Sequence, residues 1–245
     1  MQGKPQIRKE DIAQVEENVT FIFKSFNRQR QAKRLFNSIK ESYPNVKIII
    51  ADDSEKSLNL PGVINLPFNS GLSKGLQAAL DEVKTPFVMR LDDDMLLTPN
   101  TNVHEELRFL KEHPEVDLVA VMADYKKPSE YAQKFESIKM DKTLLIPAGT
   151  KIEGRTVVYK APNCFLARTA RLKKVGYDEN IHVIDHHDFF VRATGQIVCV
   201  IDPDSYVMHC HNMFEKQDYD VYRYNIYDDK QYLNRKHASK YQGGN

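Results

Sequence analysis

The stretch RLDDDMLL, residues 90–97, places three adjacent carboxylates between apolar residues. The apolar segment FVM at 87–89 precedes it, so the acids follow what is predicted to be a buried strand. Neighbouring carboxylates repel one another, and partial burial increases the cost. A compensating positive charge is therefore expected at positions 92–94, and a hard divalent cation, which prefers oxygen ligands, is a candidate.

Strands and helices alternate on both sides of this stretch. Apolar residues at helical spacing predict a helix that Asn27 would cap and Pro44 would end. The other expected elements are strands at 19–24, 46–51, 63–66, 85–91 and 117–123, and helices at 73–84 and 102–113. This order predicts an α/β fold with a mostly parallel central sheet flanked by helices. Because ligands bind where parallel strands end, Asp52, Asp53 and the acids at 92–94 should meet at one edge.

The second half of the chain is less regular. We expect strands at 163–169, 196–202 and 205–211, a short helix ending at Lys174, and a helix at 184–195. The tail is rich in tyrosine and charge, and 219–237 is predicted to be helical. The expected organisation is one domain over 1–214, with an N-terminal extension over 1–17, and a C-terminal helical extension over 215–245. That tail would pack on the domain or on a second subunit, as in a homo-oligomer.

Composition excludes several classes of protein. The 245 residues carry a formal net charge of +1, which gives no reason to expect nucleic acid as a partner. A local concentration of basic residues has two interpretations, the solvated face of a helix or a basic patch: Lys24, Arg28, Arg30, Lys33 and Arg34. The three cysteines form no CxxC pair, so we expect neither a disulfide framework nor a zinc site.

From the sequence we expect neither a signal peptide nor a membrane span. Residues 1–18 are polar, and no run of 18 or more apolar residues occurs. We therefore expect a cytoplasmic protein, with peripheral association at the inner face of the cytoplasmic membrane left open.

The acids at 92–94 form a D-x-D pattern. Alternate residues of an extended segment point the same way, so Asp92 and Asp94 should face one site while Asp93 points elsewhere. One carboxylate would hold a divalent ion, and the other would accept a hydrogen bond from a sugar hydroxyl. This is the arrangement that a metal–diphosphate site requires.

A series of segments resembles the inverting family 2 glycosyltransferases of the GT-A fold, and most of all the animal β-1,4-N-acetylgalactosaminyltransferases that build gangliosides. In the first half the segments are VTFIFKSFNR, VKIIIADDS, NSGLSKGLQAAL and FVMRLDDDM. In the second half they are NCFLART, KKVGYDE, HHDFF, VMH and YRY. The resemblance spans roughly residues 18–240 and implies a UDP-sugar donor, a Mn²⁺ or Mg²⁺ cofactor and a GT-A sheet.

The resemblance also implies roles for the strand-end acids. Asp52 and Asp53 would contact the nucleotide base, Asp94 would bind the metal, and Asp92 would bind the ribose, the metal or its waters. The remaining residues assigned to the nucleotide-sugar site are Asp93, Gly71 and Lys74, with Gly75 also in the glycine-containing loop.

The second-half motifs supply a base and further ligands. An inverting transfer needs a general base for the acceptor hydroxyl. Asp188 matches the family's acid before the paired aromatics, although Glu is usual there, and Asp185 is the alternative, unless it only caps a helix. His186 and His187 are expected to bind the acceptor or orient the base. His209 is expected to be the second metal ligand, with His211 as the alternative.

The expected function is metal-dependent transfer of a hexose or N-acetylhexosamine, N-acetylgalactosamine favoured, from a UDP-sugar to a saccharide or lipid-linked acceptor, as in polysaccharide biosynthesis. Two alternatives stay open. A non-catalytic nucleotide-sugar or carbohydrate-binding domain would need no acids at 185–188. A sugar nucleotidyltransferase would need a glycine-rich phosphate loop after the first strand, and KSFNRQR contains no glycine.

Overall fold

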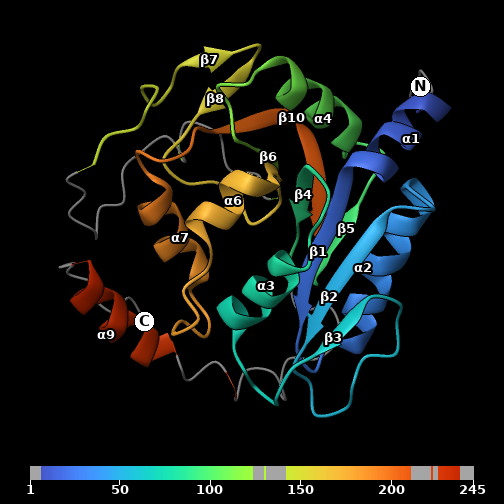
Figure 1. Cartoon of the computed structure of the whole chain (residues 1–245), viewed down its shortest axis with the longest axis vertical. Helices are drawn as coiled ribbons and strands as arrows, with labels where there is room; N and C mark the ends of the chain where they lie inside the picture. The colour runs from blue at the N-terminus through green and yellow to red at the C-terminus, as the bar shows by residue number, and fades with distance from the viewer. Residues whose placement is uncertain (1–6, 124–129, 131–141, 211–221, 223–225, 238–245) are drawn as a thin grey trace.

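The computed structural model describes residues 7–123, 130, 142–210, 222 and 226–237 as a central sheet between two layers of helices (Figure 1). The helices are α1 (Lys9–Asn18), α2 (Gln29–Ser42), α3 (Leu72–Asp81), α4 (Val103–Glu112), α6 (Thr169–Val175), α7 (Asp185–Ala193) and α9 (Ile226–Lys236). The strands are β1 (Val19–Ser25), β2 (Lys47–Asp52), β3 (Val63–Asn65), β4 (Phe87–Arg90), β5 (Met95–Leu97), β6 (Leu118–Met122), β7 (Lys151–Ile152), β8 (Arg155–Val157), β9 (Phe165–Arg168) and β10 (Cys199–His209).

The sheet has the order β3-β2-β1-β4-β9-β6-β10-β8-β7, and β5 pairs with β10 outside this path. The pairs β2–β3, β1–β2, β1–β4 and β6–β10 are parallel. Strand β9 runs antiparallel between β4 and β6, so the second half of the sheet is mixed. The predicted α/β fold with a central sheet flanked by helices is confirmed, and the parallel part holds the strands that deliver the aspartates.

The alternation of β1 explains the two helical layers. Phe21 and Phe23 enter one hydrophobic core, which includes Leu35 of α2. Ile22 enters the other core, which includes Leu76 of α3 and Phe189 of α7. Because successive strand residues point to opposite faces, a strand with buried apolar residues on both faces requires a helical layer on each face.

Two local predictions were wrong. Residues 196–211 do not form two strands, because β10 is continuous and shifts register between Asp202 and Tyr206. Pro203 lies at that shift and cannot donate a ladder hydrogen bond. Asn27 does not cap α2, since its φ is 51° and its Oδ1 accepts a hydrogen bond from Glu55 N at 3.1 Å.

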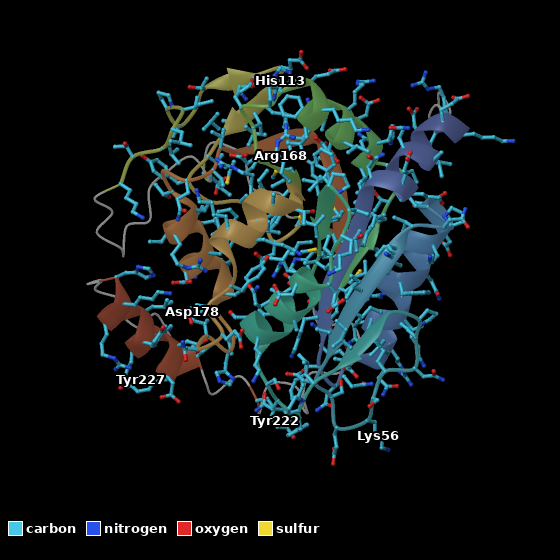
Figure 2. All side chains as sticks on the ribbon, in the orientation of Figure 1. Lys56, His113, Arg168, Asp178, Tyr222 and Tyr227 are labelled. Atoms are coloured by element: carbon cyan, nitrogen blue, oxygen red, sulfur yellow. The ribbon has the colours of Figure 1, made fainter. Side chains whose placement is uncertain are left out.

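The described part of the tail contacts the domain. The Tyr222 ring lies 5.1 Å from that of Phe26 and 5.7 Å from that of Phe68 (Figure 2). The Tyr232 hydroxyl donates to Asp178 at 2.7 Å, whereas Tyr227 is exposed. None of the helices within the described ranges is long and apolar enough to cross a membrane.

Candidate active site

The three aspartates lie in a turn after β4. Strand β4 ends at Arg90, and Met95 N donates to Asp92 O at 3.1 Å to close the turn. Arg28, which precedes α2, donates to Asp93 Oδ1 at 2.8 Å and to Asp94 Oδ2 at 3.1 Å. The prediction that Asp93 would point away from Asp94 was wrong, because the backbone turns here instead of continuing extended and Arg28 contacts both acids.

Arg90 joins this turn to the N-terminus of α7. Its side chain is fully buried, and its Nη2 lies 2.9 Å from Asp92 Oδ1 and 3.3 Å from Asp185 Oδ2. Burying a guanidinium is costly unless it is paired with negative charge. The carboxylates of Asp92 and Asp185 therefore stabilise the buried Arg90, and Arg90 fixes the positions of both carboxylates. Residues 95 positions apart in sequence thereby meet beside the acidic turn.

Asp94 and His209, the two residues predicted to bind metal, lie together. His209 Nε2 is 3.3 Å from Asp94 Oδ1, and both side chains are largely buried. The pairing of β5 with β10 and a hydrogen bond from Cys210 N to Asp94 O at 2.8 Å fix this approach. His211, the alternative ligand, is outside the described residues.

The described side chains supply only part of the ligand set of a divalent metal ion. Within the described ranges no group of three or more His, Cys, Asp or Glu side chains is arranged to hold a metal ion. Asp94 and His209 supply one oxygen and one imidazole nitrogen, a combination that suits Mn²⁺-type ions, whose remaining ligands can be waters or substrate phosphates. The pair therefore fits a divalent ion that is shared with a diphosphate.

The pKa values of the neighbouring acids Asp93 and Asp94 are shifted in opposite directions. Burial, the charge of Asp94 and that of Asp92 raise the pKa of Asp93 to about 7 despite Arg28. Burial also acts on Asp94, but His209 and Arg28 outweigh it and lower its pKa to about 2. Asp94 is therefore an anion throughout the physiological range, as a metal ligand must be, and Asp93 holds its proton up to near neutrality.

Asp53 connects β1 to the glycine loop. Its Oδ1 lies 2.6 Å from Lys24 Nζ, and its Oδ2 accepts from Gly71 N at 3.1 Å. Gly71 has a φ of 98°, and a Cβ there would lie 2.9 Å from His182 Nδ1. At Gly75 a Cβ would lie 2.5 Å from Lys24 Cγ. Both glycines are thus required by close packing around the Asp53 contacts.

Asp52 and Lys74 are placed differently. Asp52 accepts from Ser54 Oγ at 2.5 Å and from Leu58 N at 2.7 Å, so both of its carboxylate oxygens are used to shape the following turn. Lys74 is exposed on α3. The structure brings neither side chain into the group around Arg28 and Arg90.

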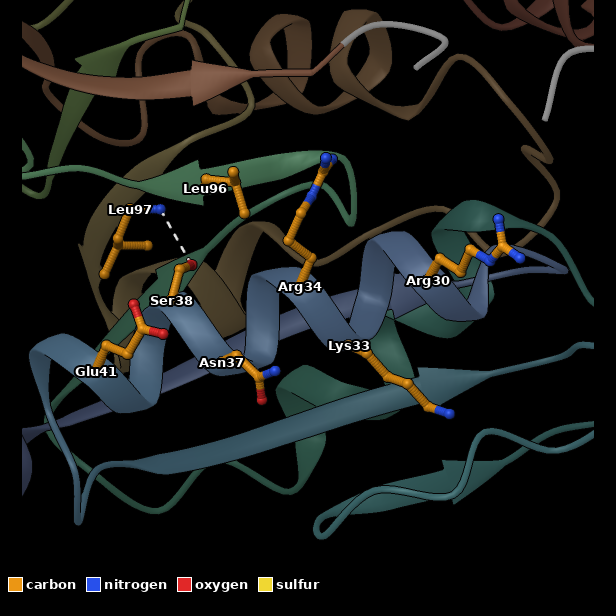
Figure 3. Close-up of a pocket in the computed structure, with 8 residues that line it drawn as sticks. All are labelled: Arg30, Lys33, Arg34, Asn37, Ser38, Glu41, Leu96 and Leu97. Atoms are coloured by element: carbon orange, nitrogen blue, oxygen red, sulfur yellow. Dashed lines mark hydrogen bonds between the residues drawn. The ribbon is translucent and has the colours of Figure 1, made fainter. Parts of the chain in front are cut away.

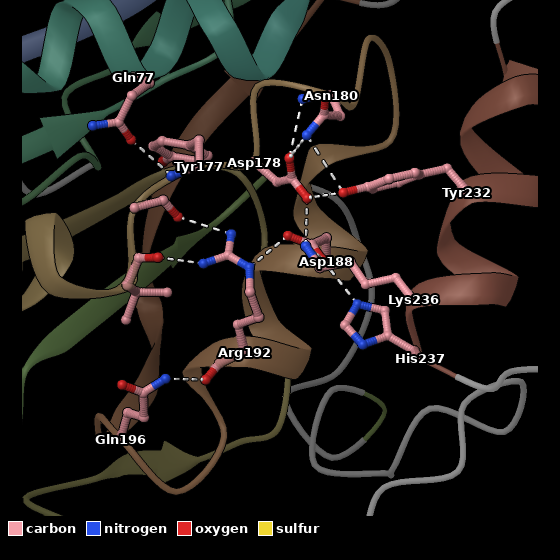
Figure 4. A network of polar contacts seen from close by, with 12 residues as sticks. Gln77, Tyr177, Asp178, Asn180, Asp188, Arg192, Gln196, Tyr232, Lys236 and His237 are labelled. Atoms are coloured by element: carbon pink, nitrogen blue, oxygen red, sulfur yellow. Dashed lines mark hydrogen bonds and ion pairs between the residues drawn. The ribbon is translucent and has the colours of Figure 1, made fainter.

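The two candidate bases, three residues apart on α7, have different neighbours. Asp185 is buried beside Arg90, and although burial raises its pKa, His186 and Arg90 lower it further, to below the ordinary value. Asp188 is buried among Arg192 at 2.6 Å, Lys236 at 2.7 Å and His237 at 2.8 Å (Figure 4). Asp185 therefore lies by the acidic turn, and Asp188 faces α9.

The rings of the two histidines between these acids contact each other at a tilt of 37°. The ring centroids of His186 and His187 are 4.1 Å apart. Burial, with the charges of His186 and Lys160, lowers the pKa of His187 to about 3, so this ring is neutral. His186 is more exposed, and its Nδ1 lies 3.9 Å from Asp185 Oδ1.

The basic cluster predicted from the sequence separates into two parts. Lys24 and Arg28 contact the strand-end acids. Arg30, Lys33 and Arg34 line an open groove of about 530 Å³ along α2, with Leu96 and Leu97 of β5 beside it (Figure 3). Sequence reasoning had left Arg28 within a general basic patch and had missed Arg90, although a charge inside the apolar segment FVMRL signals a buried ion pair.

The family model described as glycosyl transferase family 2 matches residues 20–176, well over half of the chain. The chain belongs to glycosyl transferase family 2. The match includes the acidic turn and the Gly71 loop, and it ends before α7, so the roles of residues 185–209 lie beyond it.

Curated relatives point to one subgroup of this family. The chain is 28% identical over 200 residues to mouse (Mus musculus) β-1,4 N-acetylgalactosaminyltransferase 2, a match that covers 78% of the chain and 39% of the relative. It is 30% identical over 201 residues to rat (Rattus norvegicus) β-1,4 N-acetylgalactosaminyltransferase 1, covering 73% and 36%. The family 2 chain thus spans less than two fifths of the length of these relatives, and the recognised resemblance is confirmed.

Solved structures share the fold of this family 2 domain. S. aureus TarS in complex with UDP matches with a TM-score of 0.54 at 18% identity, covering 89% of this chain and 66% of that one. The mannosyltransferase PcManGT from Pyrobaculum calidifontis, in complex with GDP-Man and Mn²⁺, matches with a TM-score of 0.57 at 13% identity, covering 89% and 64%. The predicted GT-A fold is confirmed.

Proposed function

We propose that this domain transfers a sugar from a nucleoside-diphosphate sugar to an acceptor hydroxyl with inversion at the anomeric carbon. The observation that carries the proposal is the meeting of Asp94 with His209 at the ends of β4 and β10, beside the arginine-linked pair Asp92 and Asp185. Membership of family 2 supports the same reaction.

Asp94 and His209 are the residues that would hold a divalent cation. When bound, that ion supplies positive charge that neutralises the departing diphosphate. The charge balance supports this role, because among the described residues the four carboxylates at 92–94 and 185 share two guanidinium groups, those of Arg28 and Arg90. Burial and the charges of Asp94 and Asp92 raise the pKa of Asp93, and an additional cation would offset the repulsive part of that shift.

The donor is proposed to be a UDP-sugar, with N-acetylgalactosamine favoured. The names of the curated relatives support that sugar, and neighbours of the same fold are in complexes with UDP, UDP-GlcNAc or GDP-Man. Asp53 is proposed as the carboxylate nearest the base-binding edge, because it follows β2 and is held by both Lys24 and Gly71. Asp52 would act indirectly, through the turn it organises.

The general base is proposed to be Asp185 rather than Asp188. A base must be ionised and close to the reacting centre. The lowered pKa of Asp185 keeps it ionised, and Arg90 holds it next to Asp92. Its carboxylate would accept the proton from the acceptor oxygen as that oxygen attacks the sugar, without a covalent enzyme intermediate. His186, partly exposed beside Asp185, is a proposed acceptor contact, and His187 would support it through the contact between their rings.

Product analysis tests the proposal. The chain is incubated with Mn²⁺, a panel of UDP-hexoses and UDP-N-acetylhexosamines, and saccharide or glycolipid acceptors. Release of UDP with a glycosylated acceptor is expected, and it should depend on the divalent ion. Binding of UDP-sugar without UDP release from any donor would favour the non-catalytic binding domain, and pyrophosphate in place of UDP would favour the nucleotidyltransferase. The cytoplasmic location, peripheral membrane association and self-association through the tail remain predictions.

A further inference from the structure

Asp229 of α9 holds a loop that leads into the candidate active site. The residue is 2% exposed. Its Oδ1 accepts a hydrogen bond from His182 N at 2.9 Å, and its Oδ2 accepts from Val183 N at 2.7 Å and Ile184 N at 3.1 Å. Three successive backbone N–H groups around one carboxylate form an anion-holding turn, and here the anion is supplied by the chain itself.

The loop at 182–184 touches both halves of the site. His182 O accepts a hydrogen bond from Leu72 N at 2.8 Å, and its ring lies where a side chain on Gly71 would be. Gly71 N in turn donates to Asp53. On its other side, Ile184 precedes Asp185, the first residue of α7 and the proposed base. One loop therefore sets the position of the glycine turn and of the base together.

A second set of contacts fixes the other end of α9. Lys236 Nζ lies 2.5 Å from Asp178 and 2.7 Å from Asp188, and His237 Nε2 lies 2.8 Å from Asp188 (Figure 4). The contacts of Lys236 and His237 already dock α9 on the domain, so Asp229 is not needed for that purpose. The burial of a carboxylate under the loop at 182–184 is an additional feature, and it acts on the segment that precedes the base.

We propose that Asp229 is a positioning residue for sugar transfer, which acts through the backbone of residues 182–184 on the Gly71–Leu72 turn and on Asp185. This inference rests on the proposed function for its kinetic consequence. It assigns to the C-terminal helix a part in the geometry of the reaction, not only in the stability of the domain.

Asp229→Asn is the principal test, with Asp228→Asn as its matched control because Asp228 is the exposed neighbour on the same helix. Asparagine replaces one acceptor oxygen by an N–H donor that faces backbone donors. We expect kcat for UDP release with acceptor to fall about tenfold or more, since a hydrogen bond to a charged group is lost and the base is misplaced. The Kd for UDP with Mn²⁺ should rise by a smaller factor than kcat falls, because Asp53 loses the fixed position of Gly71 N but keeps its ion pair with Lys24. Asp228→Asn should match the wild type in both.

Amide hydrogen exchange tests the same inference without any turnover. In Asp229→Asn, exchange at 182–184 and at Leu72 should accelerate about tenfold or more, while exchange in β1 and β2 should stay unchanged. Unchanged exchange at 182–184 and Leu72 would overturn the inference, whether or not the wild type transfers sugar. A wild type that transfers no sugar from any donor would instead overturn the proposed function.

A purely structural role makes a different prediction. It would lower the melting temperature of Asp229→Asn and leave kcat per folded molecule at the wild-type value, which would overturn the inference. If Asp229→Asn does not fold, Asp229→Glu takes its place. Glutamate keeps the charge and both acceptor oxygens but is one methylene longer, so kcat should fall by a smaller factor, and a wild-type kcat in that variant would count against the inference.

Discussion

Two groups of carboxylates on neighbouring elements differ in how far basic side chains compensate their charge. The strand-end cluster consists of Asp92, Asp93, Asp94 and Asp185 with Arg28, Arg90 and His209, and its acids outnumber its arginines. The helix-docking cluster consists of Asp178 and Asp188 with Arg192, Lys236 and His237, and there every acid contacts at least one cationic or ionisable partner at 2.8 Å or less. An acid-rich group has capacity for a ligand, whereas a compensated group uses its charge to join two helices.

The contrast divides the two candidate bases. Asp185 and Asp188 have the same chemistry and lie one helical turn apart, yet one belongs to each cluster. A base must exchange a proton with substrate, and a carboxylate held by three basic side chains is poorly suited to do so. The comparison therefore predicts loss of activity from changes in the strand-end cluster and loss of stability from changes in the helix-docking cluster.

The largest effect is expected for Asp94→Asn. The substitution keeps the shape of the side chain and removes the charge that would bind a divalent ion. Sugar transfer should fall about a thousandfold or more, because charge stabilisation of the departing diphosphate is lost. Initial rates and calorimetric titration with Mn²⁺ and UDP measure this. Asp204→Asn, an exposed acid on β10, is the control, and wild-type turnover in Asp94→Asn would remove the proposed metal site.

Asp185→Asn should have the next largest effect. Loss of a general base typically costs between about a hundredfold and ten-thousandfold in rate. The Kd for UDP should stay within about threefold of the wild type, because the residue is proposed to act on the acceptor proton. Single-turnover rates beside UDP titrations provide the measurement. A large fall in Asp188→Asn, with Asp185→Asn fully active, would return the base to Asp188.

Sequence reasoning predicted the position of the strand-end cluster in the fold, but it did not predict how the side chains of the cluster are arranged. The apolar strand before Asp92 and the alternation of strands and helices fixed which edge of the sheet the acids occupy. The turn at 92–94 could not be inferred in the same way, because it depends on where β4 ends and on Arg28, which is 65 residues from Asp93. The pattern D-x-D shows that carboxylates are close in sequence and does not show which share a cation.

The helix-docking cluster was less accessible to prediction. HHDFF suggests a functional acid, and nothing local indicates that Asp188 would meet Lys236 and His237 almost fifty residues later. Asp229 was missed for the same reason, since a carboxylate on a polar helix is usually solvated. Its role becomes visible only when the loop at 182–184 and α9 are seen together.

Asp188→Asn is expected to affect stability more than rate. Removing one partner of a buried ion pair leaves uncompensated charge and typically costs about 3–5 kcal/mol of unfolding free energy. Arg192 retains hydrogen bonds to the carbonyls of Val175 and Gly176, and Lys236 retains Asp178, so we expect the lower end of that range. Urea unfolding measures the change. An unfolding free energy equal to that of Asp204→Asn would show that the helix-docking cluster contributes nothing to stability.

The smallest effect concerns the pH dependence of the strand-end cluster. Because the pKa of Asp93 is raised to about 7 in the folded state, this acid binds a proton between about pH 4 and 7 that the unfolded chain has lost. Its contribution to stability is therefore complete at low pH and declines as the pH rises through that window, by at most about 1.4 kcal/mol per pH unit. Asp93→Asn is neutral throughout, so its unfolding free energy relative to the wild type should increase by about 2–2.5 kcal/mol from pH 5 to pH 7.5.

Urea unfolding in EDTA at several pH values isolates this effect. Asp204→Asn, a substitution of an exposed acid, is the control. A saturating divalent ion should flatten the Asp93→Asn difference, because a cation beside Asp94 lowers the pKa of Asp93 and lets it ionise without repulsion. A difference that is constant with pH would show that the acids at 92–94 are already fully compensated. The strand-end cluster would then resemble the helix-docking cluster, and the charge argument for a bound cation would fail.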